Sequence, residues 1–477
     1  MAMAKSPIKF GTDGWRGVIA EDFTFDNVRL CAQGVSDYLK KEGLSQRGVV
    51  IGYDTRFASE DFAAAAAEVT AGSGIKTRLC LRSAPTPVVS YTAAATRSAG
   101  AIIITASHNP GEWNGFKCRS GEGASVSDEV IARIEKEIAR AAGSGKIKRL
   151  ALDKALKKGL LDHLDPRPAY LNRIEELFST KELRRQKLAV IVDSMYGAGA
   201  GYFAEILQGG KMNLTEINAE RNPSFPGINP EPIAKNLTRL SRQVVEQKAA
   251  VGLATDGDAD RIGVIDEQGT FLNQHQVFAL LCLYLLEVRG ERGAIVKTLT
   301  STNMLSRLGQ IYHVPVYETA VGFKYVAPLM VEHEAMIGGE ESGGYGFRGH
   351  IPERDAIVAG LYFLDFMAKT GKTPSHLLKY LFDKVGPHYY DRVDVHIPQG
   401  KREAIETHLA SAAVNRIAGE KVTRRDTTDG FRFFLGDESW LLIRFSGTEP
   451  LVRVYAEAGS PKKVARLLEE GRRITGL

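Results

Sequence analysis

Three aspartates, Asp256, Asp258 and Asp260, stand within five residues of one another in the segment Thr255-Asp-Gly-Asp-Ala-Asp-Arg261. Carboxylates this close repel one another unless a cation or a basic group compensates them. Hard oxygen ligands suit Mg²⁺, which keeps few protein ligands and often completes its shell with phosphate oxygens. The spacing therefore predicts a magnesium site, with a solvated acidic turn as the alternative. Arg261 would neutralise surplus charge or present its guanidinium to a phosphoryl group at the same metal.

A calcium-binding helix-loop-helix is the competing interpretation, because Glu267 falls at the twelfth position counted from Asp256. That loop requires glycine at its sixth position, where this chain has Arg261. No helix is expected before the segment either. We therefore keep the magnesium interpretation.

Ser107 and His108 lie in a second polar segment, Thr105-Ala-Ser-His-Asn-Pro110, directly after an apolar stretch. At such a turn, helix-terminal amides can steady negative charge beside a hydroxyl nucleophile, although a simple helix cap is the alternative. Lys117 follows ten residues after Ser107 and is a candidate general acid or base. That role requires desolvation and cationic neighbours to lower its pKa, and a solvated surface lysine is the alternative.

Two further polar segments have residues suited to carbohydrate and phosphate. Glu340 and Ser342, in Gly339-Glu-Glu-Ser-Gly-Gly344, offer an acceptor and a hydroxyl of the sort that orient sugar hydroxyls. The segment 444–450 combines arginine, hydroxyls and a bare glycine backbone, which suit a phosphate dianion, and a turn between strands is the alternative. Its candidate phosphate ligands are Arg444, Ser446, Gly447 and Thr448, with Arg453 shortly after.

The first three segments each end the same course of elements: an apolar strand, a helix, a strand, a second helix and a short strand. The three passes run from 49–51 to 101–104, from 188–192 to 255, and from 294–296 to 339. This alternation predicts mixed, mostly parallel sheets with helices on both faces. Because ligands of such sheets bind at the carboxyl ends of the strands, we expect the three segments to converge on one cleft.

The chain of 477 residues is too long for one core, and the repeats with a distinct tail predict four domains. We expect three α/β domains at 1–160, 161–290 and 291–385, and an α+β domain at 386–477. In that tail, alternating apolar residues near 393–397, strands at 431–434 and 440–445, and a helix at 461–474 replace the repeat. An amphipathic helix at 128–142 is expected to link the first two domains.

Composition narrows the class of protein. A net charge of +5 is too small and too dispersed for a nucleic-acid binder. The N-terminus has no apolar signal core, and the longest apolar run, 277–286, is about half a membrane span. We expect a cytoplasmic, soluble monomer or homodimer without membrane or nucleic-acid partners. The four widely spaced cysteines are interpreted as reduced structural thiols.

The four polar segments, Thr-Ala-Ser-His-Asn-Pro, Asp-Gly-Asp-Ala-Asp-Arg, Gly-Glu-Glu-Ser-Gly-Gly and Arg-Phe-Ser-Gly-Thr-Glu-Pro, occur in this order. Together they resemble the α-D-phosphohexomutase family. The resemblance covers nearly the whole chain, starting at Gly11-Thr-Asp-Gly-Trp-Arg-Gly17. It implies three α/β domains of shared topology and a fourth, helix-grip-like domain around a deep cleft.

The resemblance also implies the reaction and its residues. Ser107 matches a phosphoserine that exchanges its phosphoryl group with a hexose phosphate through a hexose 1,6-bisphosphate, and Asp256, Asp258 and Asp260 match the ligands that bind one Mg²⁺ together with a phosphoserine oxygen. The positions that match residues assisting the transfer are Arg16, His108, Lys117 and Arg261. The positions near the sugar are Glu340, Ser342, Lys297 and Lys324, and the site of the waiting phosphate comprises Arg444, Ser446, Gly447 and Thr448.

The substrate is the least specific part of the resemblance. Gly-Glu-Glu-Ser-Gly-Gly, with Gly349-His350-Ile351 downstream, resembles phosphoglucomutases, whereas relatives that favour mannose or glucosamine phosphates have a histidine at the position of Gly344. His350 is a candidate substitute for that histidine. The Ser-Gly-Thr-Glu-Pro ending resembles the glucosamine branch. We favour glucose phosphate over mannose phosphate, with dual specificity, glucosamine phosphate, a Mg²⁺-dependent phosphatase and a non-catalytic sugar-phosphate sensor as alternatives.

Overall fold

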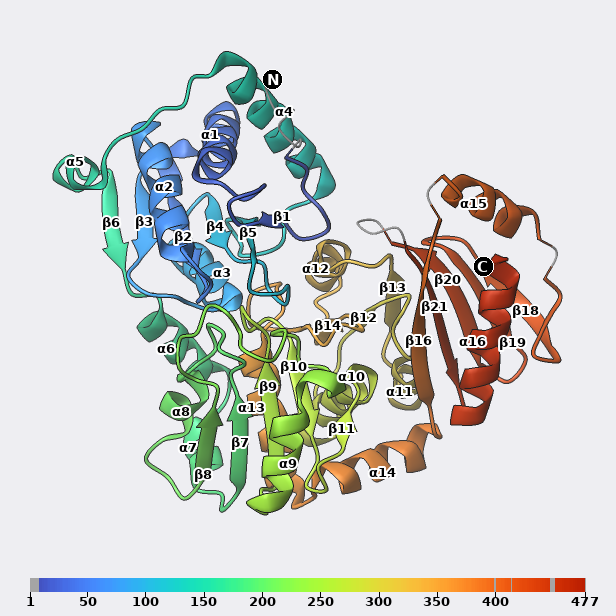
Figure 1. The fold of residues 1–477 in the computed structure, drawn as a ribbon. Helices are drawn as coiled ribbons and strands as arrows, with labels where there is room; N and C mark the ends of the chain where they lie inside the picture. Colours follow the sequence, from blue (N-terminus) through green and yellow to red (C-terminus); the bar gives the residue numbers. More distant parts are fainter. Residues whose placement is uncertain (1–7, 399, 413, 447–450, 477) are drawn as a thin grey trace.

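A computed structural model describes residues 8–398, 400–412, 414–446 and 451–476. Four sheets divide the chain into four domains, which follow one another along the sequence (Figure 1). The first domain has a six-stranded sheet of order β1-β5-β4-β2-β3-β6. Its elements are β1 Trp15–Val18, α1 Phe25–Lys41, β2 Val49–Tyr53, α2 Ser59–Gly72, β3 Thr77–Cys80, α3 Thr86–Ala95, β4 Gly100–Ile104, β5 Trp113–Ser120, α4 Asp128–Ser144, α5 Leu152–Lys157 and β6 Leu161–Leu164.

The second domain has a five-stranded sheet of order β11-β10-β9-β7-β8. Its elements are α6 Arg167–Leu177, α7 Thr180–Arg184, β7 Ala189–Asp193, α8 Tyr202–Leu207, β8 Asn213–Ile217, α9 Thr238–Glu246, β9 Val251–Thr255, β10 Ile262–Ile265 and β11 Phe271–Leu272. The helix expected at 233–247 is divided, because a 3₁₀ turn at Ala234–Asn236 precedes α9.

The third domain has a four-stranded sheet of order β13-β12-β14-β15. Its elements are α10 Gln274–Leu283, β12 Ile295–Thr298, α11 Met304–Tyr312, β13 Val316–Thr319, α12 Phe323–Glu332, β14 Ile337–Gly339, β15 Tyr345–Phe347, α13 Ala356–Thr370 and α14 Pro374–Val385. Helix α10 packs against α11, α13 and α14, so it lies with the third sheet although it precedes residue 290.

The three sheets confirm the repeat. In each, the first strand of the repeat pairs in parallel with the other two, giving the orders β4-β2-β3, β9-β7-β8 and β14-β12-β13. An antiparallel strand then follows the third one, as β5, β10 or β15. The three polar segments are the loops that join these antiparallel pairs, at 105–112, 256–261 and 340–344. Equivalent loops therefore leave equivalent edges of the three sheets.

The C-terminal domain is built differently. Its six-stranded sheet, of order β16-β21-β20-β19-β18-β17, is antiparallel throughout the described strands and is covered by two helices (Figure 1). Its elements are β16 Tyr389–His396, α15 Arg402–Ser411, β17 Arg416–Ile417, β18 Glu420–Asp426, β19 Phe431–Leu435, β20 Trp440–Phe445, β21 Leu451–Ala458 and α16 Pro461–Thr475. This confirms the α+β architecture expected after residue 386.

Apolar cores join the neighbouring domains to one another. One apolar core runs through the first three domains and includes Ile103, Val192 and Ile337 from their central sheets. The C-terminal domain has its own core, and a small cluster of Leu299 with Trp440 joins it to the third domain. Across the described ranges, none of the helices has both the length and the apolar content that a bilayer crossing requires.

The expectation for the helix at 128–142 is wrong. Helix α4 packs along α1 instead of linking domains, with Ile134 and Ile138 buried in the core of the first domain. Gly34 of α1 permits this close approach, since a Cβ there would stand 2.3 Å from Ile138. The chain then returns to add β6 beside β3, so the first sheet extends past residue 160 to Leu164.

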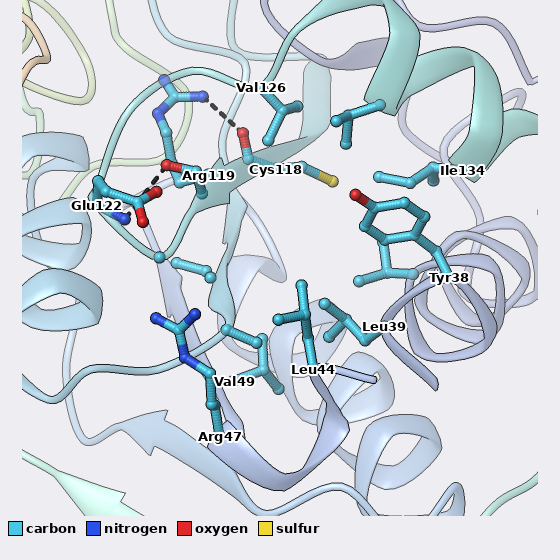
Figure 2. A pocket seen from close by; sticks show the side chains of 17 residues that line it. Tyr38, Leu39, Leu44, Arg47, Val49, Cys118, Arg119, Glu122, Val126 and Ile134 are labelled. Atoms are coloured by element: carbon cyan, nitrogen blue, oxygen red, sulfur yellow. Dashed lines mark hydrogen bonds between the residues drawn. The ribbon is translucent and has the colours of Figure 1, made fainter. Parts of the chain in front are cut away.

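All four cysteines are buried free thiols, which agrees with their interpretation as reduced structural residues. Figure 2 shows Cys118 of β5, with Tyr38 of α1 and Ile134 of α4, around a cavity of about 170 Å³. Burial raises the pKa of the Cys118 thiol to about 12. This thiol is therefore protonated and unreactive at neutral pH.

Candidate active site

The loop after β4 and the loop after β9 meet at Ser107. Its side chain is 1% exposed, and Oγ donates to Oδ2 of Asp256 at 2.8 Å. His108 Nδ1 lies 3.3 Å from the same Oγ. Ser107 itself has φ 54°, in the left-handed region, which costs about 1–2 kcal/mol for a residue other than glycine. The first two polar segments thus converge as expected, and the serine is held in a strained turn.

The three aspartates of the second loop form a compact buried cluster. One carboxylate oxygen from each of Asp256, Asp258 and Asp260 lies within 4.8 Å of the others. The backbone N–H groups of Asp260 and Arg261 donate to Oδ1 of Asp256 at 2.9 and 3.1 Å, which fixes the loop around that carboxylate. Within the described residues, Oδ1 of Asp258 and Oδ1 of Asp260 are buried without a hydrogen bond. Hard, unshared carboxylate oxygens at this spacing fit a divalent cation such as Mg²⁺.

The charges of the three aspartates differ because their neighbours differ. Burial, reinforced by Asp260 and Asp258, raises the pKa of Asp256 well above its ordinary value. Burial alone would also raise the pKa of Asp258, but Lys117 and a hydrogen bond from Thr86 hold that pKa below its ordinary value. Thr86 begins α3, and its Oγ1 lies 2.6 Å from Oδ2 of Asp258. Burial and like charges thus oppose ionisation of Asp256, which a bound divalent cation would favour.

Lys117 of β5 reaches the aspartate loop, although with neighbours opposite to those expected. Its Nζ lies 2.8 Å from Oδ2 of Asp13 and from Oδ2 of Asp258, and 3.6 Å from Oδ2 of Asp260. Burial alone would lower the pKa of Lys117, but these carboxylates more than offset that effect and the pKa is raised. Desolvation is thus present, as the acid–base role requires, but the neighbouring charges raise the pKa of Lys117 instead of lowering it. Lys117 is protonated, which suits an acid rather than a base.

Arg354, just before α13, joins the third loop to the first two. Its Nη2 lies 2.9 Å from Oδ2 of Asp260 and 2.9 Å from Oδ2 of Asp13, and its Nη1 lies 3.5 Å from Oε2 of Glu340. Burial raises the pKa of Glu340 to about 7, although Arg354 opposes the shift. Ser342 Oγ is buried, without a hydrogen bond to any described residue. One guanidinium thus contacts carboxylates from all three α/β domains.

Cationic side chains also surround His108. Burial lowers the pKa of its imidazole well below the ordinary value, and Arg261 and Arg16 lower it further. Arg16 of β1 donates to Oδ1 of Asn109 at 2.5 Å, next to the serine. His108 is consequently neutral, and its Nδ1 lone pair or N–H faces Ser107 according to the tautomer.

The fourth predicted segment lies on the C-terminal domain. Arg444 of β20 donates through Nε to Oδ1 of Asp429 at 2.9 Å, and Oδ2 of the same carboxylate accepts from the backbone N–H of Val321 in the third domain. Arg402 donates to the Ser446 carbonyl at 3.0 Å. Arg453 lies on β21 in register with Arg444. Gly447 and Thr448 lie outside the described residues.

Comparison with known proteins agrees with the four-domain fold. Sequence profiles of the phosphoglucomutase/phosphomannomutase alpha/beta/alpha domains I, II and III match residues 7–143, 168–269 and 273–385, and that of the C-terminal domain matches residues 399–474. The chain belongs to the phosphoglucomutase/phosphomannomutase family. As a member of this family it is a mutase, an isomerase by reaction class.

The relatives differ in the sugar that their names specify. The phosphoglucomutase/phosphomannomutase of Thermococcus kodakarensis is 31% identical over 462 residues, covering 97% of each chain. The phosphoglucosamine mutase of Carboxydothermus hydrogenoformans is 30% identical over 474 residues, again covering 97% of each. A crystal structure from Thermus thermophilus, assigned to the phosphomannomutases, matches with a TM-score of 0.86 and 35% identity, covering 99% of this chain and 100% of that one.

Three residues proposed for substrate contact are engaged elsewhere in this conformation. Lys297 is buried, with Nζ 3.2 Å from Oε2 of Glu318, and Lys324 pairs with Asp128 of α4. The side chain of His350 is 0% exposed, and its Nε2 lies 3.0 Å from Oδ2 of Asp355. The imidazole also stacks on Tyr91 of α3. His350 is thus enclosed by protein and leaves no face of its ring for a sugar.

Besides Arg354, which joins the three loops, sequence reasoning missed Asp13 and Arg56 of this phosphohexomutase site. Asp13 lies in the Gly11–Gly17 motif, where no role was predicted for it. It contacts Lys117, Arg119 and Arg354. Arg56 follows β2, and its side chain is fully buried under the serine loop. A signal for Arg56 existed, because Asp54-Thr55-Arg56 also leaves the carboxyl end of a parallel strand.

Proposed function

We propose that this chain transfers a phosphoryl group between the 1- and 6-positions of a hexose phosphate, through a phosphoserine at Ser107 and a hexose 1,6-bisphosphate. One observation carries the proposal: Ser107 Oγ, in a strained buried turn, donates to Asp256 of a three-carboxylate cluster. A neutral histidine lies beside the same oxygen. This is a hydroxyl next to a cation site, which phosphoryl transfer needs.

The proposed step exchanges one P–O bond for another. The bond from phosphorus to Ser107 Oγ breaks as a bond to the free sugar hydroxyl forms. The proton that the hydroxyl releases to solvent is matched by the proton that Ser107 Oγ takes up, so the exchange is balanced. Lys117, protonated among its carboxylates, is our candidate to supply a proton at the serine side. Asp256, Asp258 and Asp260 would hold Mg²⁺ with a phosphoserine oxygen. Bound Mg²⁺ would offset the charge that these groups bring together.

The bisphosphate must turn end for end, so that its other phosphate returns to Ser107. The enzyme then needs a second phosphate site, which we assign to Arg444, Ser446, Gly447 and Thr448, with Arg453 beside them. Glu340 and Ser342 would read the sugar hydroxyls between the two phosphates. Support comes from Arg354, which contacts both Glu340 and the metal loop and so relates the sugar position to the reacting centre.

Glucose phosphate is our preferred substrate, with mannose phosphate and then glucosamine phosphate as alternatives. The preference rests on Gly343-Gly344, because Gly344 stands where histidine marks the mannose and glucosamine relatives. A side chain at Gly344 would meet Arg354, since a Cβ there would stand 2.3 Å from its Cδ. Arg354 therefore fills the space that a side chain at position 344 would need, and glycine is the residue that leaves this space open.

The deciding experiment compares kcat/KM for the 1-phosphates of glucose, mannose and glucosamine, with Mg²⁺ and a trace of the matching bisphosphate. We expect glucose 1-phosphate to rank first and to yield glucose 6-phosphate. Release of inorganic phosphate instead would indicate a phosphatase. Ser107→Ala should abolish turnover yet retain hexose phosphate binding by calorimetry, and a Ser107→Ala enzyme that keeps most of its activity would refute the phosphoserine.

A further inference from the structure

Arg56 lies beneath the serine loop and gathers the backbone carbonyls of that loop. Its Nη2 donates to the carbonyls of Ser107 and Asn109 at 2.7 and 2.6 Å. Its Nη1 donates to those of Pro110 and Trp113 at 2.7 and 3.0 Å. Nε lies 3.2 Å from Oδ2 of Asp54, so the charge is balanced within the same domain. One rigid, fully buried guanidinium thus fixes the orientation of four peptide groups.

The peptide between Ser107 and His108 is the most informative of the four. Peptide bonds are trans throughout the described residues, so a carbonyl and the N–H of the next residue point in opposite directions. Because the Ser107 carbonyl points at Arg56, the His108 N–H points away from it. In the described part of the chain this N–H donates to no acceptor. His108 is the third residue of the turn closed by the Asn109 N–H to Ala106 carbonyl bond, so its own N–H is not used by the turn and can receive an acceptor beside the Ser107 hydroxyl.

We propose that Arg56 is a positioning residue, which turns the Ser107–His108 peptide so that the His108 N–H donates to an oxygen of the phosphoryl group on Ser107. The inference rests on the proposed phosphoserine mechanism and adds a backbone donor to it. Charge on the phosphoryl oxygens is stabilised by a donor that is oriented before the reaction begins.

Packing around Arg56 supports a positioning role over a general structural one. Phe225 of the second domain covers the guanidinium, with its ring centre 4.9 Å from Cζ. Asp54 also accepts from the hydroxyl of Ser59 and the N–H of Arg56, so this carboxylate is held by several groups. Lysine would keep the charge but cannot span four carbonyls with one nitrogen. Arg56→Lys therefore tests the geometry of the loop separately from its charge balance.

The first measurement separates turnover from binding. We expect Arg56→Lys to lower kcat about 10²–10³-fold, as the loss of one preorganised donor does. KM for glucose 1-phosphate should change by less than about threefold, since the substrate contacts lie on other loops. For Arg56→Ala, guanidinium ion at non-denaturing concentration should restore turnover, and urea at the same concentration should not. Arg47→Lys is the matched control, because Arg47 also donates to two carbonyls of the first domain, far from the serine loop.

The second measurement observes the N–H itself. Selective ¹⁵N-histidine labelling of the 10 histidines allows the His108 amide to be assigned through its disappearance in His108→Gln. When glucose 1,6-bisphosphate phosphorylates Ser107, the His108 amide proton should shift downfield in the wild type and shift much less in Arg56→Lys. A structural defect alone would not produce this loss selectively.

The outcomes distinguish the two levels of the hypothesis. If the wild type turns over hexose phosphates and the kcat of Arg56→Lys lies within about threefold of the wild-type value, the role of Arg56 is refuted and the proposed function still stands. An unshifted His108 amide in the wild-type phosphoenzyme would do the same. A wild type that neither turns over hexose phosphates nor accepts a phosphoryl group would overturn the proposed function and this inference with it.

Discussion

Replacing Arg354 by methionine would remove the one guanidinium that, among the described residues, contacts carboxylates of all three α/β domains. The side chain is 4% exposed and lies within 3.5 Å of Asp13, Asp260, Glu340 and Glu353. Methionine keeps much of the volume and loses the charge. Lys117 and Arg119 still contact Asp13, so the largest loss falls on Asp260 and Glu340.

Removing one partner of a buried ion pair typically costs about 3–5 kcal/mol, because it leaves an uncompensated charge. We expect Arg354→Met to lower the free energy of unfolding by that amount near pH 8. Arg354 holds down the pKa of both Asp260 and Glu340, so its removal raises both. A carboxyl whose folded-state pKa is raised stabilises the fold below its unfolded pKa, and this contribution is lost as pH rises through the folded value. The cost of Arg354→Met should therefore grow between about pH 6 and about pH 8.5.

Urea unfolding at the two pH values measures this cost, with tryptophan fluorescence as the signal; Trp15 and Trp113 lie in the first domain and Trp440 in the C-terminal domain. Arg173→Met is the control, because Arg173 pairs with Glu176 at a half-exposed position and its loss should cost less than about 1 kcal/mol. Our electrostatic account fails if Arg354→Met costs no more than this control, or if its cost shrinks as pH rises.

Three further predictions concern activity. Burial raises the pKa of Glu340 to about 7, so its carboxylate can accept hydrogen bonds from a sugar only as pH rises through that value. We therefore expect kcat/KM to fall as pH drops below about 7 in the wild type and to lose this dependence in Glu340→Gln. Lys117→Met should lower kcat about 10²–10⁴-fold while calorimetry still detects hexose phosphate binding, and a loss of binding alone would contradict the acid role. Chelation of Mg²⁺ should abolish turnover reversibly. Asp258→Asn should weaken Mg²⁺ affinity by at least about tenfold in titration calorimetry, and an unchanged affinity would show that the aspartates do not bind the metal.

The repeat was predictable from sequence because its signals are local. Strand, helix and turn patterns recur at a fixed phase, and the carboxyl ends of parallel strands determine where the loops lie. The contact of Ser107 with Asp256 follows from that rule although 149 residues separate them. Mixed sheets were expected, but the position of the antiparallel strand after each loop was not, because a strand such as β15 is short and lies next to glycines that break the apolar pattern.

Contacts between segments distant in the sequence were beyond local reasoning. The apolar stripe of α4 shows that one face is buried, but it does not identify α1 as the partner. The pKa of Lys117 depends on Asp13 and Asp258, both distant in the sequence, and its own segment reveals neither of them. His350 was expected at the sugar because of the motif around it, yet Asp355 and Tyr91 enclose it. In each case the neighbours that determine the role of the segment are distant in the sequence, and no local pattern reveals them.

The same charges that the chemistry requires also join the domains. The first domain contributes the cation of Lys117, the second contributes the aspartates, and the third contributes Arg354, so the loops attract one another only when all three are assembled. Buried ion pairs of this kind rarely add net stability over apolar packing, because desolvation offsets their attraction. We expect an apolar replacement of the whole cluster to be tolerated by the fold and to remove the proposed metal site. The persistence of so many buried charges at this junction is therefore best explained by phosphoryl transfer, and their role in holding the domains together follows from it.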